Sequence, residues 1–203
     1  MARLPGITPG KSGIGVKLAF FFTRRAMRDM TGREPERMLE PLEMYAHVPF
    51  LMNGYGKFEQ ATGKIKDLDT RKRHLAELKA ATMTHCEYCI DIGSLVARKA
   101  GLSNEELLAL PGYQTSRLFD VVDKLVLDYS VAMSNTPVEV PDSLFARLRE
   151  HFTDAQIVEL THVIALENHR GRFNLALGVG AAGFSDGMVC ALPAIHTTTV
   201  AAA

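Results

Sequence analysis

Apolar residues recur at helical spacing along most of the chain, whereas the alternating pattern typical of strands is scarce. Residues 120–133 place apolar side chains on one stripe, which predicts an amphipathic helix. Residues 70–83 have a similar pattern and predict a second helix. The mostly apolar run at 153–177 predicts a third, because Thr153 and Gln156 stand at its start in the arrangement of a capping box.

Turn-forming residues divide the remaining chain into short connections. Gly101 ends one helical stretch, and Ser103 with Glu106 forms a second capping arrangement that opens the next. Further loops are marked by Pro111, Gly112, Pro137 and Pro141. The connections are of ordinary length and we find no internal repeat. The pattern therefore predicts an all-α domain of about seven to nine helices.

Three segments of the chain differ in character. Residues 1–35 are basic and are expected to form an arm or helix that packs on the core or on a neighbouring subunit. Residues 36–190 form the predicted all-α domain, and residues 191–203 have little to bury and are expected to form a flexible tail. Binding of the basic arm to a membrane surface is an alternative, but its three consecutive phenylalanines do not make one face.

Composition narrows the function classes. The chain has 203 residues, of which 47% are apolar, and Lys+Arg and Asp+Glu both number 23. This balance gives the chain no net positive charge that would favour binding to nucleic acid. No apolar run approaches the roughly 18 residues of a transmembrane helix, and no convincing signal-peptide cleavage site is present. We therefore expect a cytoplasmic protein whose thiols are normally reduced, with no nucleic-acid partner and no membrane contact.

Two of the three cysteines lie close together. Cys86 and Cys89 are separated by two residues, whereas Cys190 stands alone, so the chain has no disulfide framework. Thr84 and Glu87 match a capping box, which predicts a helix capped at Thr84 with Cys86 at its second position. There the sulfur would lie near unpaired backbone N–H groups and the positive end of the helix dipole. Both effects favour the thiolate, which is the reactive form of cysteine.

The spacing of the pair also permits a disulfide. Residues three apart on a helix have Cα atoms about 5–6 Å apart, within the range that a disulfide tolerates. Such a pair is able to cycle between dithiol and disulfide. His85 precedes Cys86 directly, and His74 and Glu77 lie on the preceding helix, where they are candidate proton-relay groups. The candidate catalytic residues are therefore Cys86, Cys89, His85, Glu77 and His74.

Two other interpretations of the pair stay open. Cysteine is often a small buried apolar residue, so both cysteines could simply pack in the core. A zinc site would need two further ligands, for which His74 and Cys190 are the available additions. We expect no metal.

A polar cluster is predicted on the helix near residue 170. Glu167 with Arg170 and Asn168 with Arg172 have the spacing of pairs along a helix. Glu167, Arg170 and Tyr88 are candidate substrate-binding groups, since pockets carry a few converging polar side chains. The favoured alternative is a structural ion-pair network or a subunit contact.

Two further features have a structural explanation. His162 lies among apolar residues and is expected to be a hydrogen-bonded core histidine. An aromatic and aliphatic set could line a cavity, although core packing is the commoner explanation. Its members are Phe50, Leu51, Met52, Tyr55 and Phe58.

The stretch 71–110 combines a helix, the C-x-x-C motif, the sequence ARKAGLS and an acidic segment. It resembles the core of the carboxymuconolactone decarboxylase and alkylhydroperoxidase D (AhpD) superfamily, and residues 170–174 resemble a late helix of these proteins. The resemblance implies an AhpD-like all-α domain with the C-x-x-C at the start of a core helix. It also implies a homo-oligomer, either a dimer, a trimer or a hexamer. In the AhpD branch, the cysteine pair reduces peroxides or passes electrons to a partner peroxidase.

The resemblance also implies roles for single residues. By it, Cys89 is oxidised to sulfenic acid and Cys86 donates a proton and closes the disulfide. The helix-dipole argument instead favours Cys86 as the thiolate, so the division of roles stays open. Three relay positions of the family differ here, since a glutamate is replaced by His74 and two histidines by Tyr88 and Gly93. Glu77, His74 and His85 are the candidates for a substitute relay.

Taken together, the sequence predicts a thiol-dependent oxidoreductase that reduces a hydroperoxide or the disulfide of a partner thiol protein. The redox-active disulfide is the only cofactor expected. One alternative is a non-redox lyase or isomerase acting on a small organic acid, although the decarboxylase branch typically lacks the C-x-x-C. Another is a helical interaction protein that uses its basic arm.

Overall fold

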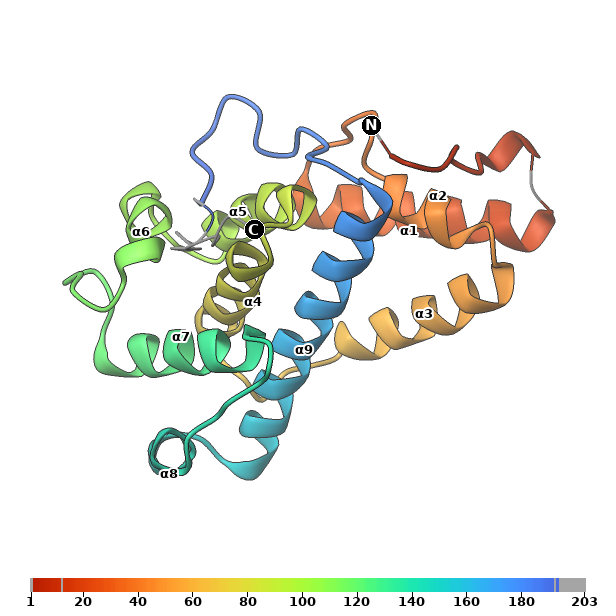
Figure 1. Cartoon of the computed structure of the whole chain (residues 1–203). Coiled ribbons are helices and arrows are strands. Elements are labelled where there is room, and N and C mark those ends of the chain that lie inside the picture. Colours follow the sequence, from red (N-terminus) through yellow and green to blue (C-terminus); the bar gives the residue numbers. More distant parts are fainter. Residues whose placement is uncertain (1, 12, 192, 194–203) are drawn as a thin grey trace, which may run out of the picture.

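A computed structural model describes residues 2–11, 13–191 and 193 of the chain. Over these residues the regular structure is entirely helical, with nine α-helices and two short 3₁₀ helices (Figure 1). In chain order they are η1 (Pro9–Lys11), α1 (Ile14–Thr31), α2 (Glu40–Tyr45), α3 (Pro49–Thr62), α4 (Thr70–Thr84), α5 (Glu87–Lys99), α6 (Asn104–Ala109), η2 (Leu110–Gly112), α7 (Val121–Ser134), α8 (Asp142–His151) and α9 (Asp154–Leu177). The predicted all-α class is confirmed.

Helix α4 is the centre of the fold, because it packs against α5, α7 and α9. Leu75 and Leu78 of α4 belong to one apolar cluster, which also contains both cysteines of the C-x-x-C motif. Ala76 and Ala80 belong to a second cluster with side chains of α7, α8 and α9. All four of these α4 residues are at most 1% exposed. The helix that leads into the cysteine pair is therefore enclosed from two sides.

The predicted helix starts are partly confirmed. The helices predicted over 70–83, 120–133 and 153–177 correspond to α4, α7 and α9. The capping boxes at Ser103 and Thr153 are both formed, each with its backbone and side-chain hydrogen bonds. Asp120 and Asp123 form another capping box at the start of α7. Such boxes are local, which is why sequence spacing identifies them well.

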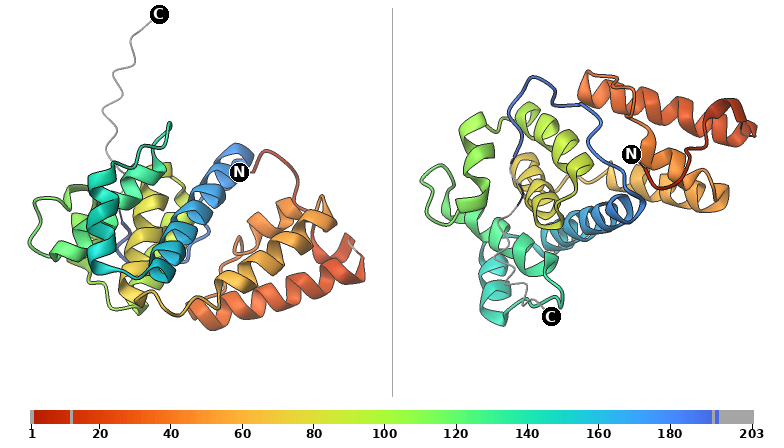
Figure 2. Two further views of the ribbon diagram at one scale, coloured as in Figure 1. Left: turned by 90° about the horizontal axis from the view of Figure 1, so that it is seen from below. Right: turned by 45° about the horizontal axis from the view of Figure 1, so that its top comes forward.

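Helices α1 and α3 lie side by side to one side of the bundle (Figure 2). Helix α1 contacts α5 as well as α3, so the basic segment docks on its own chain. Of the three consecutive phenylalanines, Phe20 is buried, whereas Phe21 and Phe22 are 61% and 62% exposed. The three phenylalanines therefore do not all lie on one face of α1, as the sequence predicted.

Core packing does not account for most of the aromatic and aliphatic set at 50–58. Met52 is buried, but Phe50 is 89% exposed, and Leu51 and Phe58 are also exposed. The expectation was wrong for these three because α3 has neighbours on only part of its surface. Helices α1 and α3, with the residue before α3, therefore carry several exposed large apolar side chains, namely Ile14, Leu18, Phe21, Phe22, Met30, Val48, Phe50, Leu51 and Phe58.

The segment after α9 returns across α5 (Figure 1). The carboxylate of Asp91 accepts four backbone N–H groups, from residues 182–185, at 2.7–3.0 Å. Further along, the Ala191 N–H donates to the Ser94 hydroxyl at 2.9 Å. Apart from residues 191 and 193, the predicted tail at 191–203 lies outside the described residues. Among the described helices, none combines the length and apolar character needed to cross a membrane.

Candidate active site around the cysteine pair

The turn between α4 and α5 positions the cysteine pair. Helix α4 ends at Thr84, and His85 follows as its C-cap in the left-handed conformation, with φ 56°. Cys86 then adopts an extended conformation and is the N-cap of α5. Its sulfur accepts the backbone N–H of Cys89 at 3.3 Å. The C-x-x-C motif therefore begins at the helix cap itself.

The predicted capping box of Thr84 and Glu87 was wrong. The Thr84 hydroxyl donates to the carbonyls of Ala80 and Ala81, at 3.2 and 3.0 Å, and so stays within its own helix. The left-handed residue at 85 ends α4 there and makes Cys86 the cap, two positions later than the spacing indicated. The sulfur nevertheless lies at the positive end of the α5 dipole, as the sequence argument required.

Cys86 and Cys89 form a disulfide, with their Cα atoms 5.2 Å apart. This distance matches the expectation for residues three apart at a helix start. Both cysteines are buried, at 0% and 4% exposure. In this oxidised state the sulfurs are thus covered by protein.

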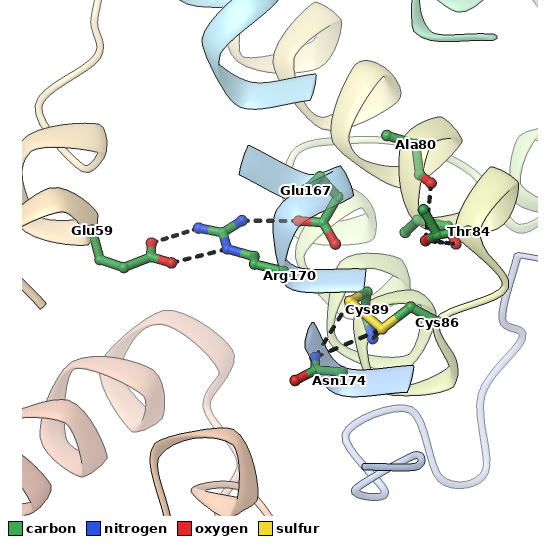
Figure 3. Close-up of a disulfide and its surroundings, with 9 residues drawn as sticks. Glu59, Ala80, Thr84, Cys86, Cys89, Glu167, Arg170 and Asn174 are labelled. Atoms are coloured by element: carbon green, nitrogen blue, oxygen red, sulfur yellow. Dashed lines mark hydrogen bonds and ion pairs between the residues drawn. A yellow bond between two sulfur atoms is a disulfide. The ribbon is translucent and has the colours of Figure 1, made fainter. Parts of the chain in front are cut away.

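Asn174 of α9 contacts both sulfurs. Its side-chain N–H group donates to the sulfur of Cys86 and to that of Cys89, each at 3.7 Å (Figure 3). The side chain is almost fully buried, at 3% exposure. The sequence places Asn174 in the polar part of this helix but does not predict its contact with the cysteines, because a contact across 88 residues leaves no local signal.

Gly171 allows α9 to approach the site closely. A Cβ atom at this position would lie only 2.5 Å from the hydroxyl oxygen of Thr84. Residues 167, 171 and 174 follow helical spacing and therefore share one face of α9. The missing side chain at 171 brings this face against the end of α4 and sets Asn174 beside the disulfide.

An ion-pair network extends along the same helix. Arg170 donates to Glu167 at 2.9 Å, so the predicted pair is present. It also donates through two nitrogens to Glu59 of α3, at 2.9 and 2.5 Å, and Tyr55 donates to the same carboxylate. In Figure 3, the helix that carries Asn174 beside the disulfide carries Glu167 and Arg170 further along.

The second predicted pair on α9 was wrong. Asn168 is buried and donates to the Ser134 hydroxyl and to the Ile164 carbonyl rather than pairing with Arg172. Arg172 is exposed and donates to the Thr136 hydroxyl at 3.0 Å. Ser134 and Thr136, which bind these two side chains, lie at or just after the end of α7. The spacing of residues within α9 does not reveal such partners.

Burial and charge act differently on the two carboxylates bound to Arg170. Burial raises the pKa of Glu167, and the positive charge of Arg170 only partly offsets this. Burial also favours a higher pKa for Glu59, but there the charge and hydrogen bonds of Arg170 prevail, so its pKa is lowered. Of the two, Glu167 therefore holds a proton more readily.

The predicted relay residues His74 and Glu77 are in contact on α4. The Nδ1 atom of His74 lies 2.9 Å from Glu77, and Arg73 donates to the other oxygen of this carboxylate at 3.1 Å. Burial alone would raise the pKa of Glu77, but these partners and the charge of Arg170 lower it. The charge of Glu77 in turn raises the pKa of Glu167, which links the polar groups of α4 and α9.

His85 and Tyr88 lie in different surroundings. His85 is exposed in the turn between α4 and α5. Tyr88 is buried, and its hydroxyl donates to the backbone carbonyl of Met38 at 2.5 Å. That bond anchors α5 to the segment before α2, while the predicted role of Tyr88 in substrate binding stays a prediction.

His162, the other histidine considered from the sequence, is hydrogen-bonded to Thr62 at 2.8 Å, as expected, but it is half-buried rather than a core residue. Over the described part of the chain, no three His, Cys, Asp or Glu side chains converge as metal ligands.

An open cavity of about 460 Å³ lies next to the end of α4, with Thr84 in its wall. Its other lining residues are Met83, Ser134, Asn135, Thr136, Arg172 and Leu175.

Comparison with known proteins gives the family. The model of the carboxymuconolactone decarboxylase family matches residues 49–118. The uncharacterized protein YnjA of Escherichia coli (strain K12) is 35% identical over 158 residues, which are 77% of this chain and 84% of the relative. The chain belongs to the carboxymuconolactone decarboxylase family. A second relative, the uncharacterized protein YdfG of Bacillus subtilis (strain 168), is 29% identical over 120 residues, which are 59% of this chain and 82% of that protein.

Solved structures confirm the AhpD-like fold. A protein from Ralstonia eutropha JMP134, described as an alkylhydroperoxidase AhpD core and uncharacterized peroxidase-related protein, has a TM-score of 0.69 and 18% identity, covering 89% of this chain and 92% of that one. The debrominase Bmp8, in complex with 2,3,4-tribromopyrrole, has a TM-score of 0.72 and 16% identity, covering 88% and 92%. At these identities the likeness concerns the fold alone.

Proposed function

We propose that the chain is a thiol-dependent oxidoreductase that cycles Cys86 and Cys89 between dithiol and disulfide. Its substrate would be a hydroperoxide or the disulfide of a partner thiol protein. The observation that carries the proposal is the bond between the two sulfurs at the cap of α5. Membership of a family named for an enzyme, with a peroxidase-related protein and a debrominase among its structural neighbours, supports an enzymatic role.

The proposed peroxide reaction balances within the pair. One thiolate attacks the terminal oxygen of the hydroperoxide, the O–O bond breaks, and the sulfur becomes a sulfenic acid. The alkoxide that leaves takes up a proton and becomes an alcohol. The second thiol then attacks the sulfenic sulfur, which releases water and closes the disulfide. The dithiol has lost two electrons, and the hydroperoxide has become an alcohol and water.

Regeneration requires an external dithiol. One of its thiolates attacks the disulfide and forms a mixed disulfide, and its second thiol then displaces the enzyme sulfur. The same exchange, run on a partner's disulfide, would make that disulfide the oxidant in place of a peroxide. In both cases the disulfide is the redox group, and the proposal requires no further cofactor.

The polar groups around the pair support proton transfer. The departing alkoxide needs a proton, and Glu167 is a buried carboxyl group whose pKa burial raises. Glu77 and His74 are in contact one helical turn apart, and Glu77 interacts electrostatically with Glu167 and Arg170. We propose that these groups replace the relay glutamate that the family resemblance places at position 74.

The proposal is tested by stopped-flow reduction of hydrogen peroxide and an alkyl hydroperoxide, with an external dithiol present. Cys86→Ser and Cys89→Ser should each lower turnover by about 10²-fold or more, because neither can close the disulfide. Cys190→Ser is the matched control and should keep wild-type turnover, since Cys190 lies outside the pair. Wild-type turnover no faster than that of either variant would contradict the peroxidase proposal.

The same variants separate the other candidate functions. The family name keeps a reaction on a small organic acid as the second candidate, for which activity would survive the loss of both thiols. The substrate panel should include a partner disulfide and 2,3,4-tribromopyrrole, because the fold is shared with a debrominase. A pure interaction protein would turn over none of these substrates.

A further inference from the structure

The two sulfurs of the pair receive different numbers of hydrogen bonds. The sulfur of Cys86 accepts the Cys89 backbone N–H at 3.3 Å and the Asn174 side-chain N–H at 3.7 Å. Within the described residues, the sulfur of Cys89 accepts only the Asn174 side chain, at 3.7 Å. Because Cys86 has one more hydrogen-bond donor, this arrangement favours a negative charge on the sulfur of Cys86 over one on the sulfur of Cys89.

The position of Cys86 in its helix acts in the same direction. Cys86 is the N-cap of α5, a helix of 13 residues, so its sulfur lies beside the unpaired N–H groups of the first turn. These groups carry the partial positive charge of the helix N-terminus. Cys89 is the third residue of α5, and its own backbone N–H is the group that donates to the Cys86 sulfur.

We propose that Asn174 and the α5 cap together hold Cys86 as the ionised sulfur of the reduced pair, with Cys89 as its protonated partner. This inference rests on the proposed function, in which a thiolate attacks first. It assigns the roles in the opposite order to the one that the AhpD resemblance implies. It also gives Asn174 a defined role, which is to stabilise the thiolate through its side-chain N–H group.

Reduction changes the strength of these contacts. A disulfide sulfur is a weak acceptor, whereas a thiolate carries a full charge and accepts charge-assisted hydrogen bonds. Once the bond opens, the Asn174 amide no longer has two equivalent acceptors, and it would turn to the charged one. Asn174 cannot easily withdraw, because it is buried and Gly171 holds its helix against Thr84.

Other charged groups of α4 and α9 would also act on a thiolate of the pair. Ionised Glu167 and Glu77 would oppose it and Arg170 would favour it, and these three groups interact with one another. Arg170 is already bound to two carboxylates, so its field is largely neutralised. Asp91 of α5 is bound by four backbone N–H groups. The position at the cap of α5 and the Cys89 N–H bond distinguish Cys86, whereas Asn174 contacts both sulfurs and would strengthen its bond to whichever one is ionised.

Thiol titration tests the assignment directly. In a Cys190→Ser background, Cys89→Ser leaves only Cys86 of the pair and Cys86→Ser leaves only Cys89. Thiolate absorbance against pH should give Cys86 a pKa lower than that of Cys89 by about one unit or more. A lower pKa at Cys89 would overturn the assignment. This measurement does not depend on turnover, so it holds even if the proposed enzymatic activity is absent.

The role of Asn174 is tested in the single-thiol protein that retains Cys86. Asn174→Leu should raise the Cys86 pKa by about one unit or more, because the donor is lost. Asn174→Asp should raise it further, since a carboxylate would face the sulfur. Asn168→Leu is the matched control: Asn168 is also buried on α9 but donates to Ser134 and Ile164. Equal shifts for Asn174→Leu and Asn168→Leu would overturn the proposal.

A further measurement keeps Asn174 in place and so does not depend on whether the Asn174 variants fold. The NMR resonances of the Asn174 side-chain amide should shift when Cys86 titrates and when the disulfide is reduced. Amide resonances that stay constant through both changes would contradict a contact with the ionised sulfur.

Discussion

The Nδ1 atom of His74 lies 2.9 Å from a carboxylate oxygen of Glu77, one helical turn further along α4. The family resemblance places a glutamate at the position of His74, so here a carboxylate is displaced by one turn and joined to an imidazole. Electrostatic interactions link this pair to the Glu167–Arg170 pair of α9. Helices α4 and α9, of which α4 leads into the C-x-x-C motif and α9 carries Asn174, thus share one polar network.

If this network supplies protons, Glu77→Gln should lower the turnover of hydroperoxide by about 10–10²-fold, since one titrating group is lost. The variant should fold, because glutamine retains acceptor and donor groups for His74 and Arg73. Glu150→Gln, on the exposed side of α8, is the control. The comparison is made by steady-state kinetics across pH, and equal turnover in all three proteins would exclude Glu77 from the relay.

Gly171 offers a structural test of how closely α9 approaches the pair. A Cβ atom there would lie 2.5 Å from the Thr84 hydroxyl oxygen and 2.9 Å from its Cβ atom, so Gly171→Ala should lower the free energy of unfolding by about 1–3 kcal/mol. Gly54→Ala is the control, because its Cβ would meet nothing within 4 Å in helix α3. There the substitution should be neutral or stabilise by about 0.4–1 kcal/mol. Urea denaturation measures both, and equal effects would contradict close packing at residue 171.

Buried Lys79 predicts a pH dependence of stability. Burial lowers the pKa of Lys79 from 10.5 to about 8, and Asp128 opposes this only in part. Its ammonium group donates to the Leu110 carbonyl at 3.4 Å and lies 4.8 Å from the centre of the Tyr113 ring. Between pH 8 and 10.5 the unfolded chain binds more protons than the folded chain, so the free energy of unfolding should rise with pH.

The rise attributable to Lys79 should be on the order of 1–2 kcal/mol and should vanish in Lys79→Met. Lys57→Met removes an exposed lysine and should leave the pH dependence as in the wild type. Denaturant unfolding at pH values below 8 and near 10 gives the difference between variants. An unchanged pH slope in Lys79→Met would show that the lysine titrates normally in the folded chain.

The exposed phenylalanines of α1 bear on the predicted homo-oligomer. Phe21 and Phe22 are 61% and 62% exposed, and large exposed apolar side chains commonly mark protein contacts. If α1 contributes to self-association, Phe21→Lys with Phe22→Lys should reduce the molar mass found by light scattering after size-exclusion chromatography. Phe145→Lys on α8 is the control, at 40% exposure. A monomeric wild-type chain would end the oligomer prediction.

Local signals explain what the sequence reveals about this fold. Helical periodicity located α4, α7 and α9, and capping boxes located the starts at Ser103 and Thr153. The spacing of the cysteine pair was sufficient to predict that a disulfide can close. Each of these features depends on residues within about one or two helical turns of one another.

The parts that sequence reasoning missed depend on backbone conformation or on distant contacts. The left-handed conformation of His85 moved the helix start from Thr84 to Cys86, and no spacing rule indicates it. The contact of Asn174 with the sulfurs joins residues that are 85 and 88 positions apart. The pairing of Asp91 with residues 182–185 spans more than 90 positions. Tertiary packing alone brings these groups together.

The hydrogen bonds between Asp91 and residues 182–185 limit how far the chain can be shortened without losing contacts close to the cysteine pair. The family model covers only residues 49–118, which include both cysteines but neither Asn174 nor the amides that bind Asp91. An excised fragment of that length would leave a carboxylate without its four donors, two positions beyond Cys89. The C-x-x-C motif is contiguous in the chain, but the groups that contact it and Asp91 come from the C-terminal part of the described fold.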